Sequence, residues 1–231
     1  MSPIEEAIQK LDKRLAGVGF DFAFLGGSVL SLLVTNPDVD TVRVTKDVDV
    51  MMDIRTRRDF HRADRILEGL GFRHDTREDA PICRWVYDDV TVDVLPTTED
   101  VLGWKSKWFA EALEESAAIT VGRRRVRVVT APYFVALKLE AFEDRGAGDF
   151  VTSTDFEDVI CLFNGRVTIA DEIAACEKLR AGLAGKFAGY LNSPGLEDAV
   201  DGFVQTESDP ELCKARIMGM FKSVAALASI S

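Results

Sequence analysis

Carboxylates alternate with valines in the run Asp47-Val48-Asp49-Val50, which opens an apolar stretch that reaches Ile54. A period of two is typical of a β-strand with one face in the core. We therefore expect a strand over Asp47–Ile54, with Asp47 and Asp49 on one face and Val48 and Val50 on the other. An exposed strand edge would explain this pattern without a ligand. However, two adjacent like charges repel each other, so the apolar flanks favour a bound cation, and Mg²⁺ prefers carboxylate oxygens.

A third carboxylate interrupts another apolar run, Val90–Leu95, at Asp93. The same alternation puts Asp93 on one face with Thr91 and Leu95. A buried and unpaired Asp would cost several kcal/mol, so Asp93 is expected to face solvent or to pair with a cation. Asp93 is therefore the candidate third ligand of a metal site formed with Asp47 and Asp49.

A turn of small residues, Gly26-Gly27-Ser28, separates the predicted strand Phe20–Leu25 from the apolar run Val29–Val34. Two glycines let the backbone approach a ligand closely, and a helix that starts here directs free N–H groups at it. Ser28 stands at the position of a helix cap. Phosphate is the natural ligand of such a turn, although many tight turns have the same composition.

The remaining pattern predicts an α/β (α+β) fold, a mixed β-sheet flanked by helices and followed by a helical C-terminal part. We place the core at residues 1–130 and the helical part at residues 131–231. The predicted elements are helices at Ile4–Leu15, Arg57–Leu70 and Lys105–Ala117, a hairpin of Arg84–Tyr87 and Val90–Leu95 around Asp88-Asp89, a strand around Val126–Val129, and near-continuous helix from Asp155 to Ala228.

Composition narrows the possible functions. The net charge of -11 argues against a surface that binds nucleic acid throughout, although Arg123–Arg127 offers a local basic stretch for which a solvated face is the simpler reading. The four cysteines are scattered without a CxxC pair, and two histidines leave little material for a zinc site. The apolar runs are too short to cross a membrane, and the first residues do not resemble a signal peptide. We therefore expect a cytoplasmic protein.

Several of these motifs together resemble a known family. Phe24–Leu30 followed by Arg43–Val50 is similar to the AbiEii-type nucleotidyltransferases of the polymerase-β-like nucleotidyltransferase superfamily, as are Val126–Pro132 and Asp155–Val159. A Lys at position 138 followed by an Asp-x-x-Asp segment points to this branch, which includes the toxins of toxin–antitoxin pairs.

The resemblance implies a role for each matching residue. Gly27 and Ser28 would hold the triphosphate, with Gly26 and Thr45 as further nucleotide-binding residues, and Asp47 and Asp49 would hold Mg²⁺, or alternatively Mn²⁺. Asp93, singled out above from its own strand, is the expected third metal ligand. Lys138 would neutralise phosphate and count among the catalytic residues together with Asp155 and the three metal-binding acids. Asp93 would also help to deprotonate the acceptor hydroxyl.

The expected reaction is transfer of a nucleotidyl group from a nucleoside triphosphate to the 3′ end of a tRNA or to a protein hydroxyl. A toxin of this kind would imply an antitoxin partner. Two alternatives stay open. An acidic protein would suit a polycationic small molecule such as an aminoglycoside as acceptor, and a fold of this type could bind nucleotides or proteins without catalysis.

Overall fold

The computed structural model describes residues 2–37, 39, 47–103, 106–146 and 148–230. Contacts divide the chain into two compact units, and each is described here by itself. The first unit comprises Met1–Val29 and Arg43–Thr130, and the second comprises Leu30–Val42 and Ala131–Ser231. The segment Leu30–Val42, which the sequence places with the core, thus belongs by its contacts to the helical unit.

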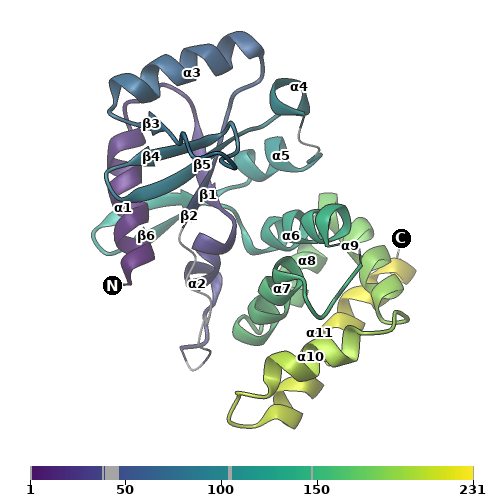
Figure 1. Cartoon of the computed structure of the whole chain (residues 1–231). Coiled ribbons are helices and arrows are strands. Elements are labelled where there is room, and N and C mark those ends of the chain that lie inside the picture. The colour runs from purple at the N-terminus through teal and green to yellow at the C-terminus, as the bar shows by residue number, and fades with distance from the viewer. Residues whose placement is uncertain (1, 38, 40–46, 104–105, 147, 231) are drawn as a thin grey trace. The chain divides into compact units, whose positions relative to one another are not determined.

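The strands of the first unit form one seven-stranded mixed sheet in the order β3-β4-β5-β2-β1-β7-β6. Figure 1 shows this sheet and labels its strands except β7. Parallel pairing joins β2 to β5 and β1 to β7, and the other neighbours are antiparallel. The strands are β1 (Phe22–Leu25), β2 (Asp47–Met52), β3 (Arg73–His74), β4 (Arg84–Tyr87), β5 (Val90–Pro96), β6 (Ala117–Val121) and β7 (Arg124–Val128).

Alternating burial explains how the central strands fit this sheet. In β2, Val48 and Val50 are fully buried, while Asp47 and Asp49 are partly accessible. In β5, the valines are buried and Asp93 lies on the more accessible face. The expected division of these strands into a core face and a polar face is confirmed.

Helices of the first unit pack against the sheet. Helix α1 (Pro3–Leu15) contacts β2 and β7 and begins with a capping box of Ser2 and Glu5. The other helical segments of this unit are α3 (Arg57–Gly69), α4 (Glu99–Leu102), α5 (Phe109–Glu114) and the 3₁₀ turn η1 (Gly27–Val29).

Some predicted boundaries need correction. The helix expected over 105–117 is limited to α5, and its last residue, Ala117, starts β6 instead. Arg127 explains the early helix end, because its guanidinium donates to the Leu113 carbonyl and to the Ser116 hydroxyl at 2.7 and 3.0 Å. Lys105 lies outside the described residues.

The second unit is helical, as expected. Its core gathers aromatic rings, with Phe221 packed against Phe163 and Phe187 at centroid distances of 4.8 and 4.9 Å. The helices are α2 (Leu30–Leu33), α6 (Ala131–Arg145), α7 (Thr154–Gly165), α8 (Ile169–Ala175), α9 (Glu177–Tyr190), α10 (Leu196–Val204) and α11 (Pro210–Ala226), followed by the 3₁₀ helix η2 (Leu227–Ile230).

The segment that follows η1 docks on the end of α7. The backbone N–H groups of Thr35 and Asn36 both donate to the Gly165 carbonyl at 2.9 Å. A Cβ on Gly165 would lie 2.6 Å from Val34 Cγ1, so only glycine admits this approach. None of the helices in the described part of the chain has the length and apolar character needed to cross a lipid bilayer.

Candidate functional site

The acidic residues of the sheet meet in one row of paired residues. Asp49 of β2 is the register partner of Asp93 in the parallel strand β5. Residues that pair directly across strands project to the same face, so these two carboxylates lie side by side. Asp47, two residues before Asp49, shares that face. Strand register thus places the three acids that the sequence singled out on one face of the sheet.

Arg84 extends the row on the other side of Asp93. It is the register partner of Asp93 in the β4–β5 hairpin. Its Nε and Nη2 donate to the two oxygens of Asp93 at 2.8 and 2.7 Å, and Nη2 also donates to Asp47 Oδ2 at 3.1 Å. One guanidinium therefore bridges two of the three acids.

This cluster is partly removed from solvent. The side chains of Asp93, Arg84 and Asp47 are 13%, 23% and 38% exposed. The hydrogen bonds to Asp93, together with the charges of both carboxylates, outweigh desolvation and raise the pKa of Arg84 above its ordinary value. Burial, reinforced by the charge of Asp93, raises the pKa of the neighbouring Cys83 thiol to about 12. Cys83 is thus a neutral thiol at pH 7 and not a nucleophile.

The sequence reasoning missed Arg84, although a signal for it exists. Asp88-Asp89 is a two-residue hairpin turn, and Asp88 adopts a positive φ of 50°. Such a turn pairs Tyr87 with Val90, and counting back along both strands makes Arg84 the partner of Asp93. Arg84 could therefore have been identified from the sequence as the cation expected to pair with Asp93.

Gly26 and Asp49 lie in close contact at the other end of the row. Leu25 is the register partner of Asp49, and Gly26 follows with a φ of +70°. A Cβ on Gly26 would lie 1.9 Å from Asp49 Oδ2. Gly26 is thus required twice, for its left-handed backbone and for the space that the Asp49 carboxylate occupies.

The Gly26-Gly27-Ser28 turn differs from the expected helix start. Ser28 is not a helix cap. It lies inside η1, it is buried, and its Oγ donates to the Leu25 carbonyl at 3.0 Å. The following helix α2 has only four residues, so it adds little dipole. Any anion at this turn would be bound by backbone N–H groups at the start of η1, which have no partner within their own helix.

Lys138 and Asp155 belong to the second unit. Lys138 is buried on α6, and its Nζ lies 3.0 Å from Asp155 Oδ1 and 2.6 Å from Asp158 Oδ2. Arg145 forms two further hydrogen bonds with Asp155, at 2.8 and 3.0 Å. Burial alone would raise the pKa of Asp155, but the hydrogen bond from Arg145 and the charge of Lys138 outweigh it and lower that pKa.

One predicted site residue, Thr45, lies outside the described residues. Among the described residues, no three His, Cys, Asp or Glu side chains converge closely enough to form a ready-made metal site. The donor set nevertheless fits a hard divalent cation in its chemistry, because three carboxylates from adjacent strands share one face. As the residues stand, Arg84 lies between two of these carboxylates.

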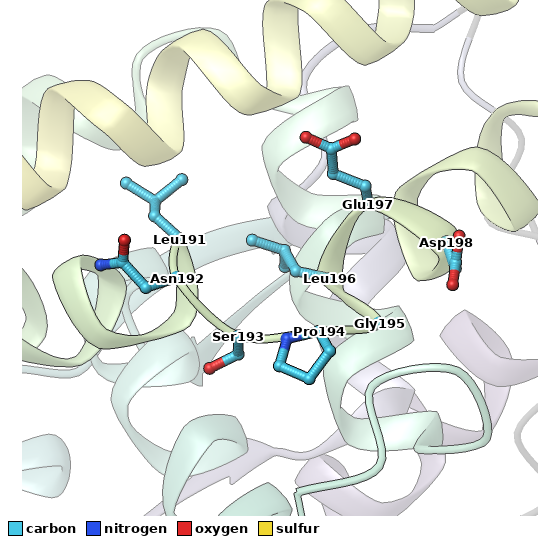
Figure 2. Close-up of a pocket in the computed structure, with 8 residues that line it drawn as sticks. All are labelled: Leu191, Asn192, Ser193, Pro194, Gly195, Leu196, Glu197 and Asp198. Atoms are coloured by element: carbon cyan, nitrogen blue, oxygen red, sulfur yellow. The ribbon is translucent and has the colours of Figure 1, made fainter.

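A pocket of about 440 Å³ lies elsewhere, in the second unit. It is lined by the eight consecutive residues 191–198, which form the connection from α9 to α10 and the start of α10 (Figure 2). Its charged groups are Glu197 and Asp198, and no cation lines it. It contains none of the residues that the sequence singled out, so the acidic residues of the sheet remain the candidate site.

The fold has counterparts among solved structures. No family model matches the chain, and no curated protein matches it. An antigenic nucleotidyltransferase-like protein from Paracoccidioides brasiliensis superposes with a TM-score of 0.51 and 16% identity, over 92% of each chain. The antibiotic-resistance factor ANT(2'')-Ia superposes with a TM-score of 0.48 and 14% identity, over 80% of this chain and 93% of that chain. JHP933 from Helicobacter pylori superposes with a TM-score of 0.42 and 13% identity, over 100% of this chain and 95% of that chain. The first likeness shows that the chain has a nucleotidyltransferase-like fold, a mixed sheet flanked by helices.

Proposed function

We propose that the protein is a magnesium-dependent nucleotidyltransferase. The observation that carries the proposal is the row in which Asp49 and Asp93 are register partners, with Asp47 on the same face and Gly26 packed against Asp49. This row lies in a sheet of the nucleotidyltransferase-like type. Phosphoryl-transfer chemistry needs charge neutralisation and positioning more than covalent catalysis, and clustered carboxylates suit that need.

Each residue of the row has a role in the proposed reaction. Asp47 and Asp49 would hold the magnesium ion, with Asp93 as the third ligand. The ion would neutralise charge that develops on the phosphate oxygens. The N–H groups at Gly27 and Ser28 would orient the triphosphate.

In the proposed reaction, the oxygen of an acceptor hydroxyl forms a bond to the α-phosphorus. The bond from that phosphorus to the oxygen bridging to the β-phosphate breaks, and pyrophosphate leaves with the electron pair. Asp93 accepts the proton of the hydroxyl. From the family resemblance, Lys138 carries a predicted phosphate-neutralising role and Asp155 a predicted catalytic role, while within their own unit they form an ion-pair cluster.

Asp49→Asn tests catalysis. We expect the variant to lose nucleotidyl transfer by at least about a hundredfold, because the neutral amide cannot replace the carboxylate toward a divalent ion. Asp89→Asn is the matched control, since Asp89 is 87% exposed in the hairpin turn and pairs with Lys10. Unchanged triphosphate turnover in Asp49→Asn would favour the alternative of a non-catalytic nucleotide-binding protein.

The acceptor is proposed to be an RNA 3′ end, such as that of a tRNA, or a protein hydroxyl. We also propose that the protein acts as the toxin of a toxin–antitoxin pair. Incubation with labelled triphosphates and total tRNA, and separately with cell protein, tests the acceptor. Growth inhibition on expression, relieved by Asp49→Asn, tests the toxin role. Label in neither fraction would contradict both acceptor classes.

A cationic small molecule, of the aminoglycoside kind, is the second candidate acceptor, and the arrangement of the basic stretch favours it. Arg124 is held by Asp12 through two hydrogen bonds of 2.9 and 2.7 Å, and Arg127 is held by the end of α5. Two of the arginines suggested for nucleic acid are thus engaged within the fold. The net charge of -11 also favours a polycation. Label transfer to an aminoglycoside but not to tRNA or protein would support this candidate.

A further inference from the structure

Arg84 uses part of the same carboxylate surface that a divalent cation would need. Its guanidinium accounts for one hydrogen bond on each oxygen of Asp93 and for one on Asp47 Oδ2. The strand pairing of Arg84 with Asp93 fixes this placement, because the two residues face each other in the β4–β5 ladder. The contact is therefore built into the sheet and is not a chance surface pair.

Charge strengthens the conflict between the two cations. Three carboxylates against one guanidinium leave these four side chains a formal charge of −2, so the cluster still attracts a dication. A dication that used oxygens of Asp47 and Asp93 would stand within a few ångströms of the guanidinium and would be repelled by it. Like charges this close together repel strongly in a partly buried site, because water screens them less there than in bulk solvent.

Arg84 can move aside without unfolding the sheet. Its backbone is held in β4, while its side chain is long, has several rotatable bonds and is partly accessible to solvent. The loss of two bonds to Asp93 and one to Asp47 would be offset by the bonds from the arriving cation to the same oxygens.

We propose that Arg84 is a built-in counter-ion that holds Asp47 and Asp93 together in the absence of metal, and that a divalent cation must displace its guanidinium to bind there. This inference rests on the proposed function only in taking these acids as the metal ligands. Arg84 thereby sets the affinity and the threshold concentration of the metal site, and it keeps three clustered carboxylates compatible with a folded, metal-free protein.

The test is calorimetric titration with Mn²⁺ alone, without nucleotide. It compares the wild type with Arg84→Gln, Arg84→Lys and the control Arg77→Gln. Arg77 is an exposed arginine of the connection between β3 and β4 that pairs with Asp75. Arg84→Gln is expected to lower the dissociation constant for Mn²⁺ by at least about tenfold, because the competing charge is gone. The dissociation constant of Arg84→Lys for Mn²⁺ is expected to lie between those of the wild type and Arg84→Gln, since an ammonium group keeps the charge but cannot reproduce the bidentate contact. Arg77→Gln is expected to stay within about twofold of the wild type, because Arg77 is exposed and its charge acts on Asp47 through solvent that screens it.

The result that overturns the inference is an Mn²⁺ affinity of Arg84→Gln that equals or falls below that of the wild type. If Arg84→Gln does not fold without metal, Arg84→Lys decides, and an affinity no higher than wild type then overturns the inference. A second readout is the rise in Tm that Mn²⁺ produces, which should be larger in the Arg84 variants.

These outcomes separate the inference from the proposed function. Asp49-dependent nucleotidyl transfer without tighter Mn²⁺ binding in Arg84→Gln refutes the role of Arg84 and leaves the enzyme. Tighter Mn²⁺ binding in Arg84→Gln without any nucleotidyl transfer in the wild type refutes the proposed enzyme activity and supports the counter-ion role of Arg84.

Discussion

The carboxylate of Asp49 occupies the space in which a side chain on Gly26 would have to stand, 1.9 Å from the position of a Cβ. Asp49 lies in β2, and Gly26 directly follows the neighbouring antiparallel strand β1, so the two residues come from the two motifs that the sequence marks most clearly. The glycine therefore does more than permit a turn. It decides where the second acid of the row can lie, and this couples the turn to the acidic strand.

Gly26→Ala should consequently cost more than the strain of a left-handed backbone. Gly103→Ala is the matched control, because Gly103 lies in the same unit at a φ of +76° with nothing within 4 Å of a built Cβ. We expect the control to lose about 1 kcal/mol of unfolding free energy and Gly26→Ala to lose about 2–3 kcal/mol, by strain plus the clash with Asp49. Urea denaturation measures both. Equal losses of unfolding free energy in the two variants would show that the Asp49 side chain moves aside at no cost.

The Arg84–Asp93 pair should show coupling in a double-mutant cycle. Arg84→Gln alone leaves a partly buried carboxylate without its bidentate partner, and we expect it to lose about 2 kcal/mol of unfolding free energy without metal. Once Asp93 is already Asn, the same change should cost less. Thermal and urea unfolding of the two single variants and the double variant give the coupling. Strict additivity would mean that the pair contributes nothing beyond its separate residues.

The buried Asp155 predicts a pH dependence of stability. Its pKa is lower in the folded protein than in the unfolded chain, because Arg145 and Lys138 outweigh the effect of burial. A lowered pKa stabilises the fold above the unfolded value of about 4, and that contribution is lost as pH falls through the folded value. The gap in unfolding free energy between wild type and Asp155→Asn should therefore be full at pH 6 and shrink below about pH 4.

Urea midpoints from pH 7 to pH 3 measure this gap, provided that the protein stays folded at the acid end. Glu157→Gln, an exposed change on the same helix, serves as the control and should show a flat difference. A difference in unfolding free energy between wild type and Asp155→Asn that grows as the pH falls would contradict a lowered pKa of Asp155.

Gly165→Ala tests the docking of the segment after η1 on α7. The added methyl would stand 2.6 Å from Val34 Cγ1, so we expect a loss of about 1–3 kcal/mol of unfolding free energy from overpacking. Val34→Ala in the same chain should restore much of that loss by removing the clashing methyl groups. Urea unfolding of the two single variants and the double variant checks this. Failure of the second change to rescue the first would place the strain elsewhere.

The central acids were predictable from sequence because strand alternation is a local property. Asp47, Asp49 and Asp93 each interrupt an apolar run, and period two alone decides their face. Their meeting across β2 and β5 is not local, because it depends on which strands pair and in which register. The residues suggested that meeting only as a hypothesis, because a third acid would complete a metal site, and the strand pairing that brings Asp93 beside Asp49 could not be derived from local alternation.

The misreading of Ser28 has a different cause. A serine after two glycines and before an apolar run is typical of a helix cap, yet its hydroxyl turns back to the Leu25 carbonyl inside a 3₁₀ turn. Hydroxyls satisfy nearby backbone groups in several competing ways, and the choice depends on tertiary packing. Ser28 is buried, and that burial favours the inward bond.

The path of the chain between the two units carries a consequence for synthesis. The chain passes from one unit to the other at Val29, returns at Arg43, and leaves again after Thr130. As the polypeptide leaves the ribosome, Leu30 and Leu33 emerge well before α7, so the surface that buries them does not yet exist. All strands of the sheet lie between Phe22 and Val128, so the sheet can form at this stage while Leu30 and Leu33 still lack the helix α7 that α2 contacts. Fragments that end near residue 130 should expose these leucines and aggregate, and a chaperone that binds nascent apolar segments would find one here.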